Sequence, residues 1–158
     1  MKRLLTLWAV LGMTYVAIET LWRGDSHPSM FIVGGLCGLL GGSINQWPRF
    51  YRTPVILQSV IGAIMVLTVE FVAGCILNLW LELGVWDYSN QPGNILGQVC
   101  PVYGLLWLFL MPMAIWAEDT GRWLIWFYEA KTHSSQLLPP EQEIYTLSSV
   151  YLDFFTGQ

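Results

Sequence analysis

The 158-residue sequence contains little charge. Lys, Arg, Asp and Glu make up 11% of the chain, whereas about a quarter is usual in soluble domains. Apolar residues make up 54%, which also excludes an intrinsically disordered chain. Nine Trp and fifteen Gly are typical of a bilayer protein, in which Trp lies at the interface and Gly permits close helix contact. The composition therefore predicts an integral membrane protein in contact with the lipid bilayer.

Basic residues, cysteines and histidines are also scarce. Seven Lys and Arg against eleven Asp and Glu give a net charge of −4, which argues against nucleic-acid binding. Three Cys cannot complete a disulfide framework. A Cys75–Cys100 disulfide is the alternative to the default of buried free cysteines. His27 and His133 are predicted on opposite sides of the membrane, so we expect no metal site and no cofactor.

Four stretches approach the length of about 20 apolar residues that a bilayer core of about 30 Å requires. They run from Leu4 to Trp22, from Met30 to Ile44 or Trp47, from Pro54 to Leu83, and from Val102 to Ala117 or Trp126. The predicted fold class is therefore an all-α membrane protein with four transmembrane helices. A structured or re-entrant loop joins the third and fourth helices, and an amphipathic tail ends the chain.

The distribution of basic residues orients the predicted helices. With both termini in the cytoplasm, six of the seven Lys and Arg lie on the cytoplasmic side, and Arg23 lies outside. The segment from Glu141 to Phe155 has apolar residues at helical spacing, namely Ile144, Leu147, Tyr151 and Phe154. We expect a multi-pass protein of the cell membrane, with a transmembrane domain over 1–128 and a cytoplasmic amphipathic tail over 129–158.

Glycines form a stripe on the second predicted helix. Gly34, Gly38 and Gly42 follow one another at intervals of four residues, in a double GxxxG pattern. Because Gly has no side chain, another helix backbone can approach closely there. The stripe predicts helix packing, either within the subunit or in a homo-oligomer. In the alternative interpretation, it leaves room for a substrate.

Glu70 lies near the middle of the third predicted helix. An unpaired charge at that depth costs at least about 2.5–3.5 kcal/mol, so such a residue normally faces the bundle interior and has a partner or a function. Asn78 lies two turns further along the same side of the helix. Glu19, in the last turn of the first helix, is predicted to emerge on the same side of the membrane as the loop after the third helix. The alternative for Glu70 is a neutral carboxyl hydrogen-bonded between helices.

The loop over residues 84–101 is rich in aromatic, amide and turn-forming residues. Asp87 lies between Trp86 and Tyr88, and aromatic rings and carboxylates both favour a positive charge. The predicted ligand-binding residues are Glu19, Glu70, Asn78, Trp86, Asp87, Tyr88, Asn94 and Gln98. In the alternative interpretation, Trp86 and Tyr88 anchor the interface, while Asp87 and Asn94 cap short helices.

Two runs in this region form a recognisable signature: EFVAGCILN at 70–78 and VWDYS at 85–89, followed by Pro92, Asn94, Gly97, Gln98 and Cys100. The pattern resembles the CmpB-type family of small membrane proteins labelled ABC-transporter type IV permeases, whose animal relatives are described as transmembrane-protein-229-like. The resemblance covers about residues 10 to 117. It implies a four-helix integral membrane protein, and it favours a ligand site over a simple cap in the loop.

Three functions remain open from the sequence. The first is binding or translocation of a small polar or cationic solute, as a transporter or a transporter-associated subunit. The second is a membrane enzyme that acts on a lipid headgroup or lipid-linked substrate, with Glu19 and Asp87 as acid–base groups. The third is a structural or accessory subunit without chemistry. A small bundle has little room for a pore, so transport favours an oligomer or a partner subunit.

Overall fold

The computed structural model describes residues 2–47, 49–50, 53–133 and 147–157. Within these ranges the regular structure is entirely helical, as predicted. The elements are α1 (Lys2–Arg23), α2 (Ser29–Gly42), the 3₁₀ turn η1 (Ser43–Gln46), α3 (Val55–Gly74), the π-helical η2 (Cys75–Trp80), α4 (Pro101–His133) and α5 (Leu147–Thr156).

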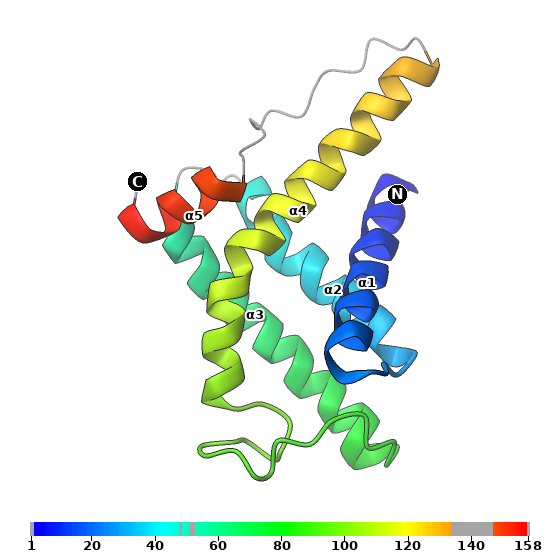
Figure 1. Ribbon diagram of the computed structural model, residues 1–158, viewed down its shortest axis with the longest axis vertical. Helices are drawn as coiled ribbons and strands as arrows, with labels where there is room; N and C mark the ends of the chain where they lie inside the picture. Colours follow the sequence, from blue (N-terminus) through cyan, green and yellow to red (C-terminus); the bar gives the residue numbers. More distant parts are fainter. Residues whose placement is uncertain (1, 48, 51–52, 134–146, 158) are drawn as a thin grey trace.

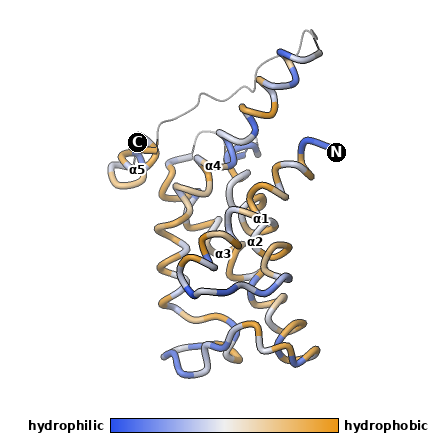
Figure 2. The backbone as a smooth tube through the Cα atoms, turned by 45° about the vertical axis from the view of Figure 1, so that its right-hand side comes forward, coloured by the Kyte–Doolittle hydropathy of each residue, from blue (hydrophilic) through white to orange (hydrophobic). Residues whose placement is uncertain are grey.

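Successive long helices run in opposite directions (Figure 1). The α1–α2 turn and the loop over residues 81–100 therefore lie at one end of the bundle, which we call the loop end. The N-terminus, η1 and α5 lie at the opposite end, which we call the tail end. Hydrophobic residues run along the helices, while hydrophilic residues gather at the two ends and in the connections (Figure 2). This distribution fits a bundle whose sides face lipid.

Three helical stretches of the described chain are long and apolar enough to cross a membrane: Lys2–Arg23, Val55–Trp80 and Pro101–Thr132. The chain is therefore a multi-pass membrane protein. The second predicted span is shorter than these three, because α2 has 14 residues and continues only through the four residues of η1. The fourth predicted span lies within a longer helix, since α4 continues to His133.

Proline and glycine set several helix ends. Pro54 precedes α3 and Pro101 is the first residue of α4, where a fixed φ and a missing N–H cost nothing. Gly24 follows α1 with a φ of 89°, a left-handed conformation that closes a helix C-terminus. Pro112 lies inside α4, where it cannot donate to the carbonyl of Leu108. The two halves of α4 therefore meet at a weakened point.

The glycine stripe packs within the chain. A Cβ at Gly34 would lie 2.5 Å from Cγ of Tyr15 in α1, and a Cβ at Gly42 would lie 2.8 Å from the Ala114 carbonyl in α4. Because α1 and α4 cover Gly34, Gly38 and Gly42 within the described chain, the stripe packs inside the subunit, and a homo-oligomer through these residues stays a prediction. The close contacts follow from the missing side chains, as predicted for helix packing.

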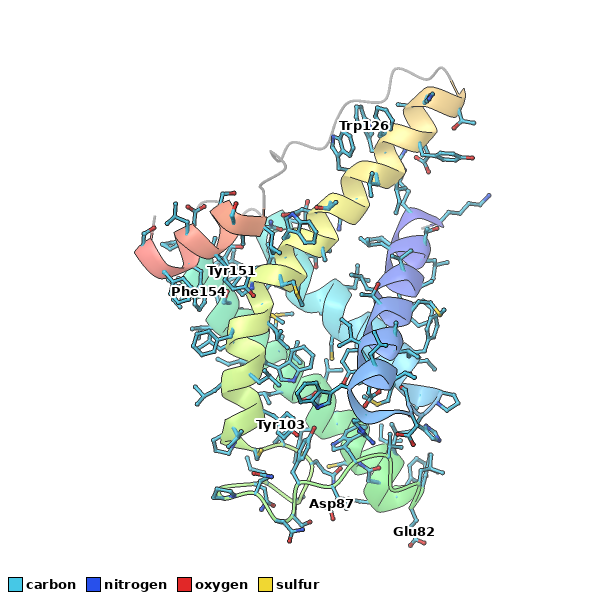
Figure 3. All side chains as sticks on the ribbon, in the orientation of Figure 1. Glu82, Asp87, Tyr103, Trp126, Tyr151 and Phe154 are labelled. Carbon is cyan, nitrogen blue, oxygen red and sulfur yellow. The ribbon has the colours of Figure 1, made fainter. Side chains whose placement is uncertain are left out.

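The C-terminal helix α5 packs against α3 and α4. Its Val150 and Phe154 are buried, and the Tyr151 hydroxyl donates a hydrogen bond of 2.8 Å to the Phe109 carbonyl. Tyr151 and Phe154 face α4 (Figure 3). The prediction of a helix is confirmed from Leu147 onward, whereas its first part, from Glu141, lies outside the described residues. Its apolar residues lie on more than one face, because Leu152 and Phe155 are exposed.

Candidate functional site

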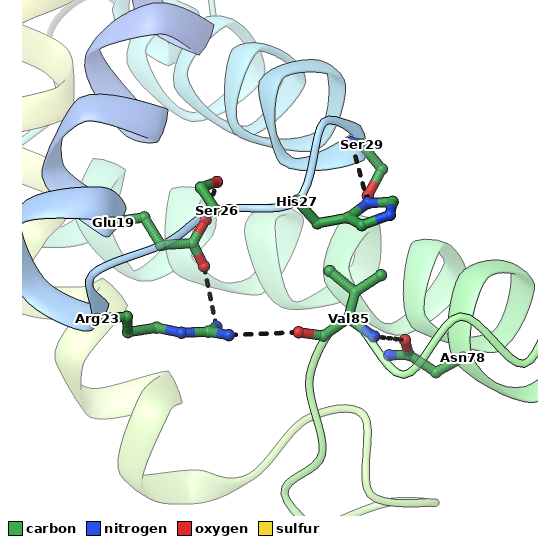
Figure 4. A network of polar contacts seen from close by, with 7 residues as sticks. All are labelled: Glu19, Arg23, Ser26, His27, Ser29, Asn78 and Val85. Atoms are coloured by element: carbon green, nitrogen blue, oxygen red, sulfur yellow. Dashed lines mark hydrogen bonds and ion pairs between the residues drawn. The ribbon is translucent and has the colours of Figure 1, made fainter.

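Glu19 is buried at the loop end. It lies in a network of polar contacts there (Figure 4). One carboxylate oxygen accepts a hydrogen bond of 3.0 Å from Arg23, and the other accepts one of 2.6 Å from Ser26. Arg23 also donates to the Val85 carbonyl at 3.5 Å. The end of α1 is thereby tied both to the α1–α2 turn and to the long loop. Both oxygens of Glu19 already have donors.

Asn78 and Gln98 connect η2 to the long loop. The Asn78 side-chain amide donates to Oε1 of Gln98 at 2.8 Å, and its Oδ1 accepts the backbone N–H of Val85 at 2.7 Å. The Trp86 indole donates to the Gln98 carbonyl at 3.0 Å. Val85, Trp86 and Gln98 are all buried. The loop thus lies across the loop end (Figure 1), with Val85, Trp86 and residues 97–100 buried against the bundle.

Replacing Asn78 with leucine is expected to loosen this loop. The change removes the acceptor of the Val85 N–H and the donor to Gln98, and a buried group left without its partner costs about 1–3 kcal/mol. We expect faster amide hydrogen exchange over residues 85–98 and a lower melting temperature. Asn90→Leu is the matched control, because Asn90 is exposed. Equal exchange in both variants would show that Asn78 does not hold the loop.

Asp87 and Asn94 shape the exposed part of the loop. Asp87 accepts hydrogen bonds from the Ser89 hydroxyl at 2.5 Å and from the Ser89 N–H at 2.8 Å, and these bonds hold the pKa of Asp87 below its usual range. The Asn94 amide donates to the Gln91 carbonyl at 2.8 Å, and its Oδ1 accepts the Gly97 N–H at 2.9 Å. Asp87 points away from the helices (Figure 3).

Tyr88 turns from the loop toward the bundle. It is half-buried and stacks on Tyr103 of α4, with ring centroids 4.3 Å apart and planes 21° apart. Burial, and then the charge of Glu70, raise the pKa of Tyr88. Tyr88 packs against the buried core of the bundle and lies within electrostatic range of Glu70.

Glu70 faces the interior of the bundle and is 7% exposed. Its Oε1 accepts a hydrogen bond of 2.9 Å from the Trp107 indole of α4. Its Oε2 is buried and has no hydrogen-bond partner among the described residues. Tyr15 of α1 and Cys37 of α2 lie within electrostatic range of the carboxylate, and the Tyr15 and Trp107 rings stack with centroids 6.4 Å apart. Every one of the four long helices therefore contributes to the surroundings of Glu70.

The buried acids differ in their partners. Arg23 pairs with Glu19, and Arg122 pairs with Glu118 on the next turn of α4. In the described part of the chain no basic side chain pairs with Glu70. Glu70 is thus a buried carboxyl with one neutral donor and one unoccupied oxygen. That arrangement suits a group that receives a proton or a cation.

The structure divides the eight predicted ligand-binding residues into two groups. Glu70 and Tyr88 lie near each other, and Tyr15 links Glu70 electrostatically to Glu19. The other five residues form hydrogen bonds that organise the loop end: Asn78, Trp86, Asp87, Asn94 and Gln98.

Sequence reasoning missed two contributors to the Glu70 environment, Tyr15 and Trp107. Tyr15 lies one turn before Glu19 on the same face of α1, and this spacing could have placed Tyr15 beside the predicted site. Trp107 looked like any aromatic residue in an apolar helix, and only the packing of α4 against α3 identifies it as the partner of Glu70.

The three cysteines Cys37, Cys75 and Cys100 are free. Cys37 and Cys100 are buried as predicted, whereas Cys75 is half-buried. Among the described residues, no three His, Cys, Asp and Glu side chains come together in a way that could hold a metal ion. The chemistry open to the Glu70 site is therefore that of a carboxyl group among aromatic rings.

A multi-pass helical bundle with a buried carboxyl between its helices defines the class: an integral membrane protein with a polar centre in its interior. A model of the family described as "Putative ABC-transporter type IV", the CmpB family, matches residues 6–130. The chain belongs to this family, which confirms the resemblance seen in the sequence. The match includes Glu19, Glu70 and the long loop, whereas α5 lies beyond it. No curated protein and no solved structure matches the chain.

Proposed function

We propose that this protein binds and translocates a small cationic solute, as a transporter or a transporter-associated subunit, with Glu70 as the cation-binding carboxylate. The observation that carries the proposal is the buried Oε2 of Glu70, which has no donor. A charged carboxylate at this depth costs at least about 2.5–3.5 kcal/mol. A bound cation would offset that cost.

The rings around Glu70 support a cation over an anion. Aromatic faces attract positive charge, and quaternary ammonium ligands are commonly recognised in this way. Tyr15 and Trp107 stack beside the carboxylate, and Tyr88 approaches it from the loop. A compact ammonium ion such as tetramethylammonium matches both the carboxylate and the rings.

Translocation requires a path from one side of the membrane to the other, and we assign four crossings. The helical segment of α2 and η1 rises about 29 Å, given about 1.5 Å per α-helical and 2.0 Å per 3₁₀ residue, which supports a second crossing. Both termini then lie in the cytoplasm, consistent with the basic residues. Residues 1–128 form the transmembrane domain and 129–158 a cytoplasmic tail.

Two other functions have less support. For chemistry on a lipid headgroup, Glu19 and Asp87 would act as acid and base, but Glu19 is paired with Arg23 and Ser26. Asp87 has the hydroxyl and N–H of Ser89 on one oxygen. A purely structural role explains Asn78 and Gln98, yet it gives no reason for the unoccupied oxygen of Glu70.

The test is binding of radiolabelled tetramethylammonium to the purified protein in lipid nanodiscs. We expect saturable binding by the wild type and a loss of at least about tenfold in affinity for Glu70→Gln, which removes the charge and keeps the shape. Glu82→Gln is the matched control, because Glu82 is an exposed acid at the same end of the bundle. Absence of saturable binding, or equal affinity of the wild type and Glu70→Gln, would contradict the proposal.

A further inference from the structure

The interior of the bundle is layered along α3 and α4. Toward the loop end lies an outer polar layer, which contains Glu70 and its donor Trp107. Eleven residues nearer the tail end on each helix lie Ser59 of α3 and Glu118 of α4, both fully buried. Eleven residues correspond to about 16 Å of helix and to about three full turns. Ser59 and Glu118 therefore lie on the same inner faces as Glu70 and Trp107.

Glu118 belongs to an inner polar layer, which we define as Asn45, Gln46, Gln58, Ser59, Glu118 and Asp119. Asn45 and Gln46 donate side-chain hydrogen bonds to the two oxygens of Asp119, at 2.7 and 2.9 Å. Glu118 pairs with Arg122. Two more groups of this layer have no partner in the described structure: Oγ of Ser59 and Oε1 of Gln58, whose side chains are 0% and 5% exposed.

Helical register directs Ser59 and Gln58 toward this layer. Gly62, one turn further along α3, contacts Ile44 and Met111: a Cβ there would lie 3.1 Å from Ile44 Cδ1. Ser59 lies three residues nearer the tail end on the same side, and α3 packs against η1, which contains Asn45 and Gln46. The layer thus combines carboxylates with unoccupied oxygen acceptors, which are the groups that coordinate cations.

An apolar layer separates the two polar layers. It consists of Val66 and Met111, both 0% exposed, together with Ile44 at 1%. The Met111 side chain lies between two glycines, since a Cβ at Gly41 or Gly62 would lie 3.0 or 2.5 Å from its sulfur. Met is unbranched and adaptable, and the next residue, Pro112, weakens α4 at this level. Hydrophobic constrictions of this kind act as gates in channels.

We infer that the inner polar layer is a second binding site for the same cation, and that Met111 gates the path between it and Glu70. This inference rests on the proposed function. The cation passes through the interior of one chain, from the Glu70 carboxylate to Glu118 and Asp119. Arg122 pairs with Glu118 when the inner site is empty. The arriving cation takes the place of Arg122 beside the Glu118 carboxylate.

Efflux of radiolabelled tetramethylammonium from proteoliposomes tests the gate. Met111→Ala removes the constriction and is expected to raise efflux about tenfold over the wild type. Neutralising the inner site in that background, by Glu118→Gln with Arg122→Gln, is expected to return efflux to the wild-type rate. Arg122 is changed together with Glu118 so that no half-buried arginine is left without its carboxylate partner. Asp119→Asn provides a second neutral variant. Glu129→Gln with Arg3→Gln is the matched control, since that ion pair is far more exposed, with side chains 30% and 50% exposed.

The outcomes separate the two proposals. An efflux rate of Met111→Ala equal to that of the wild type would overturn the gate. An efflux rate that stays at the Met111→Ala level after Glu118→Gln with Arg122→Gln, and also after Asp119→Asn, would overturn the inner site. Binding that still depends on Glu70 would then leave the proposed function standing. Conversely, efflux that depends on Glu118 and not on Glu70 would overturn the role of Glu70 and support the inner site.

Discussion

Replacing Glu70 with methionine, together with Trp107→Phe, is expected to stabilise the folded protein while abolishing tetramethylammonium binding. Glu70 has one donor and one unoccupied oxygen in the interior, so its burial costs free energy that its contacts do not return. Removing both hydrogen-bonding partners at once leaves neither group unsatisfied. Apolar replacement of a buried ion pair is commonly neutral or stabilising by about 1–4 kcal/mol. No basic side chain of the described chain pairs with Glu70, and we expect about 1–3 kcal/mol here.

The measurement is thermal unfolding in detergent, followed by size-exclusion chromatography, with binding measured in parallel. Glu19→Met is the contrasting variant. That change leaves Arg23 and Ser26 without the carboxylate that both contact, so we expect a lower melting temperature. A clear loss of stability in the Glu70 and Trp107 double variant would favour the structural interpretation, in which this acid only joins helices.

Replacing Gly12 with alanine is expected to separate α1 from α2. A Cβ at this position would lie 2.4 Å from the carbonyl oxygen of Phe31. That oxygen belongs to the backbone of α2, so it cannot move aside as the end of a side chain can. Overpacking of this kind costs about 1–3 kcal/mol, and we place Gly12→Ala at the upper end of that range.

The check is again the melting temperature, compared with Gly104→Ala. At Gly104 the added Cβ would meet one flexible atom, Cδ1 of Leu67, at 3.2 Å, so we expect little change. Equal melting temperatures for the two variants would contradict the close α1–α2 contact. They would also reopen the glycine stripe to pairing with a second copy, because the packing of Tyr15 on Gly34 belongs to the same interface.

Much of this protein follows from composition and local pattern. Low charge and long apolar runs determine a multi-pass helical protein, because a bilayer selects apolar residues over a fixed length. The inward orientation of Glu70 also follows, since an acid pointing into lipid is costly. The signature at 70–78 and 85–89 led to the family that the comparison confirms. The second predicted span holds least well, because α2 ends after 14 residues at Gly42 and the polar segment Ser43–Gln46 that follows tightens into η1.

Packing between helices decided the rest. The side chains that pack on the glycine stripe include Tyr15 of α1 and Glu118 of α4. No spacing within α2 could predict these partners. The same holds for Trp107 as the donor to Glu70 and for Met111 between two glycines. Asn78 of η2 and Gln98 of the loop looked free for a ligand, yet their side chains are hydrogen-bonded to each other. Local sequence sets which side chains point inward, whereas the partner each one meets depends on the crossing of helices that are distant in the chain.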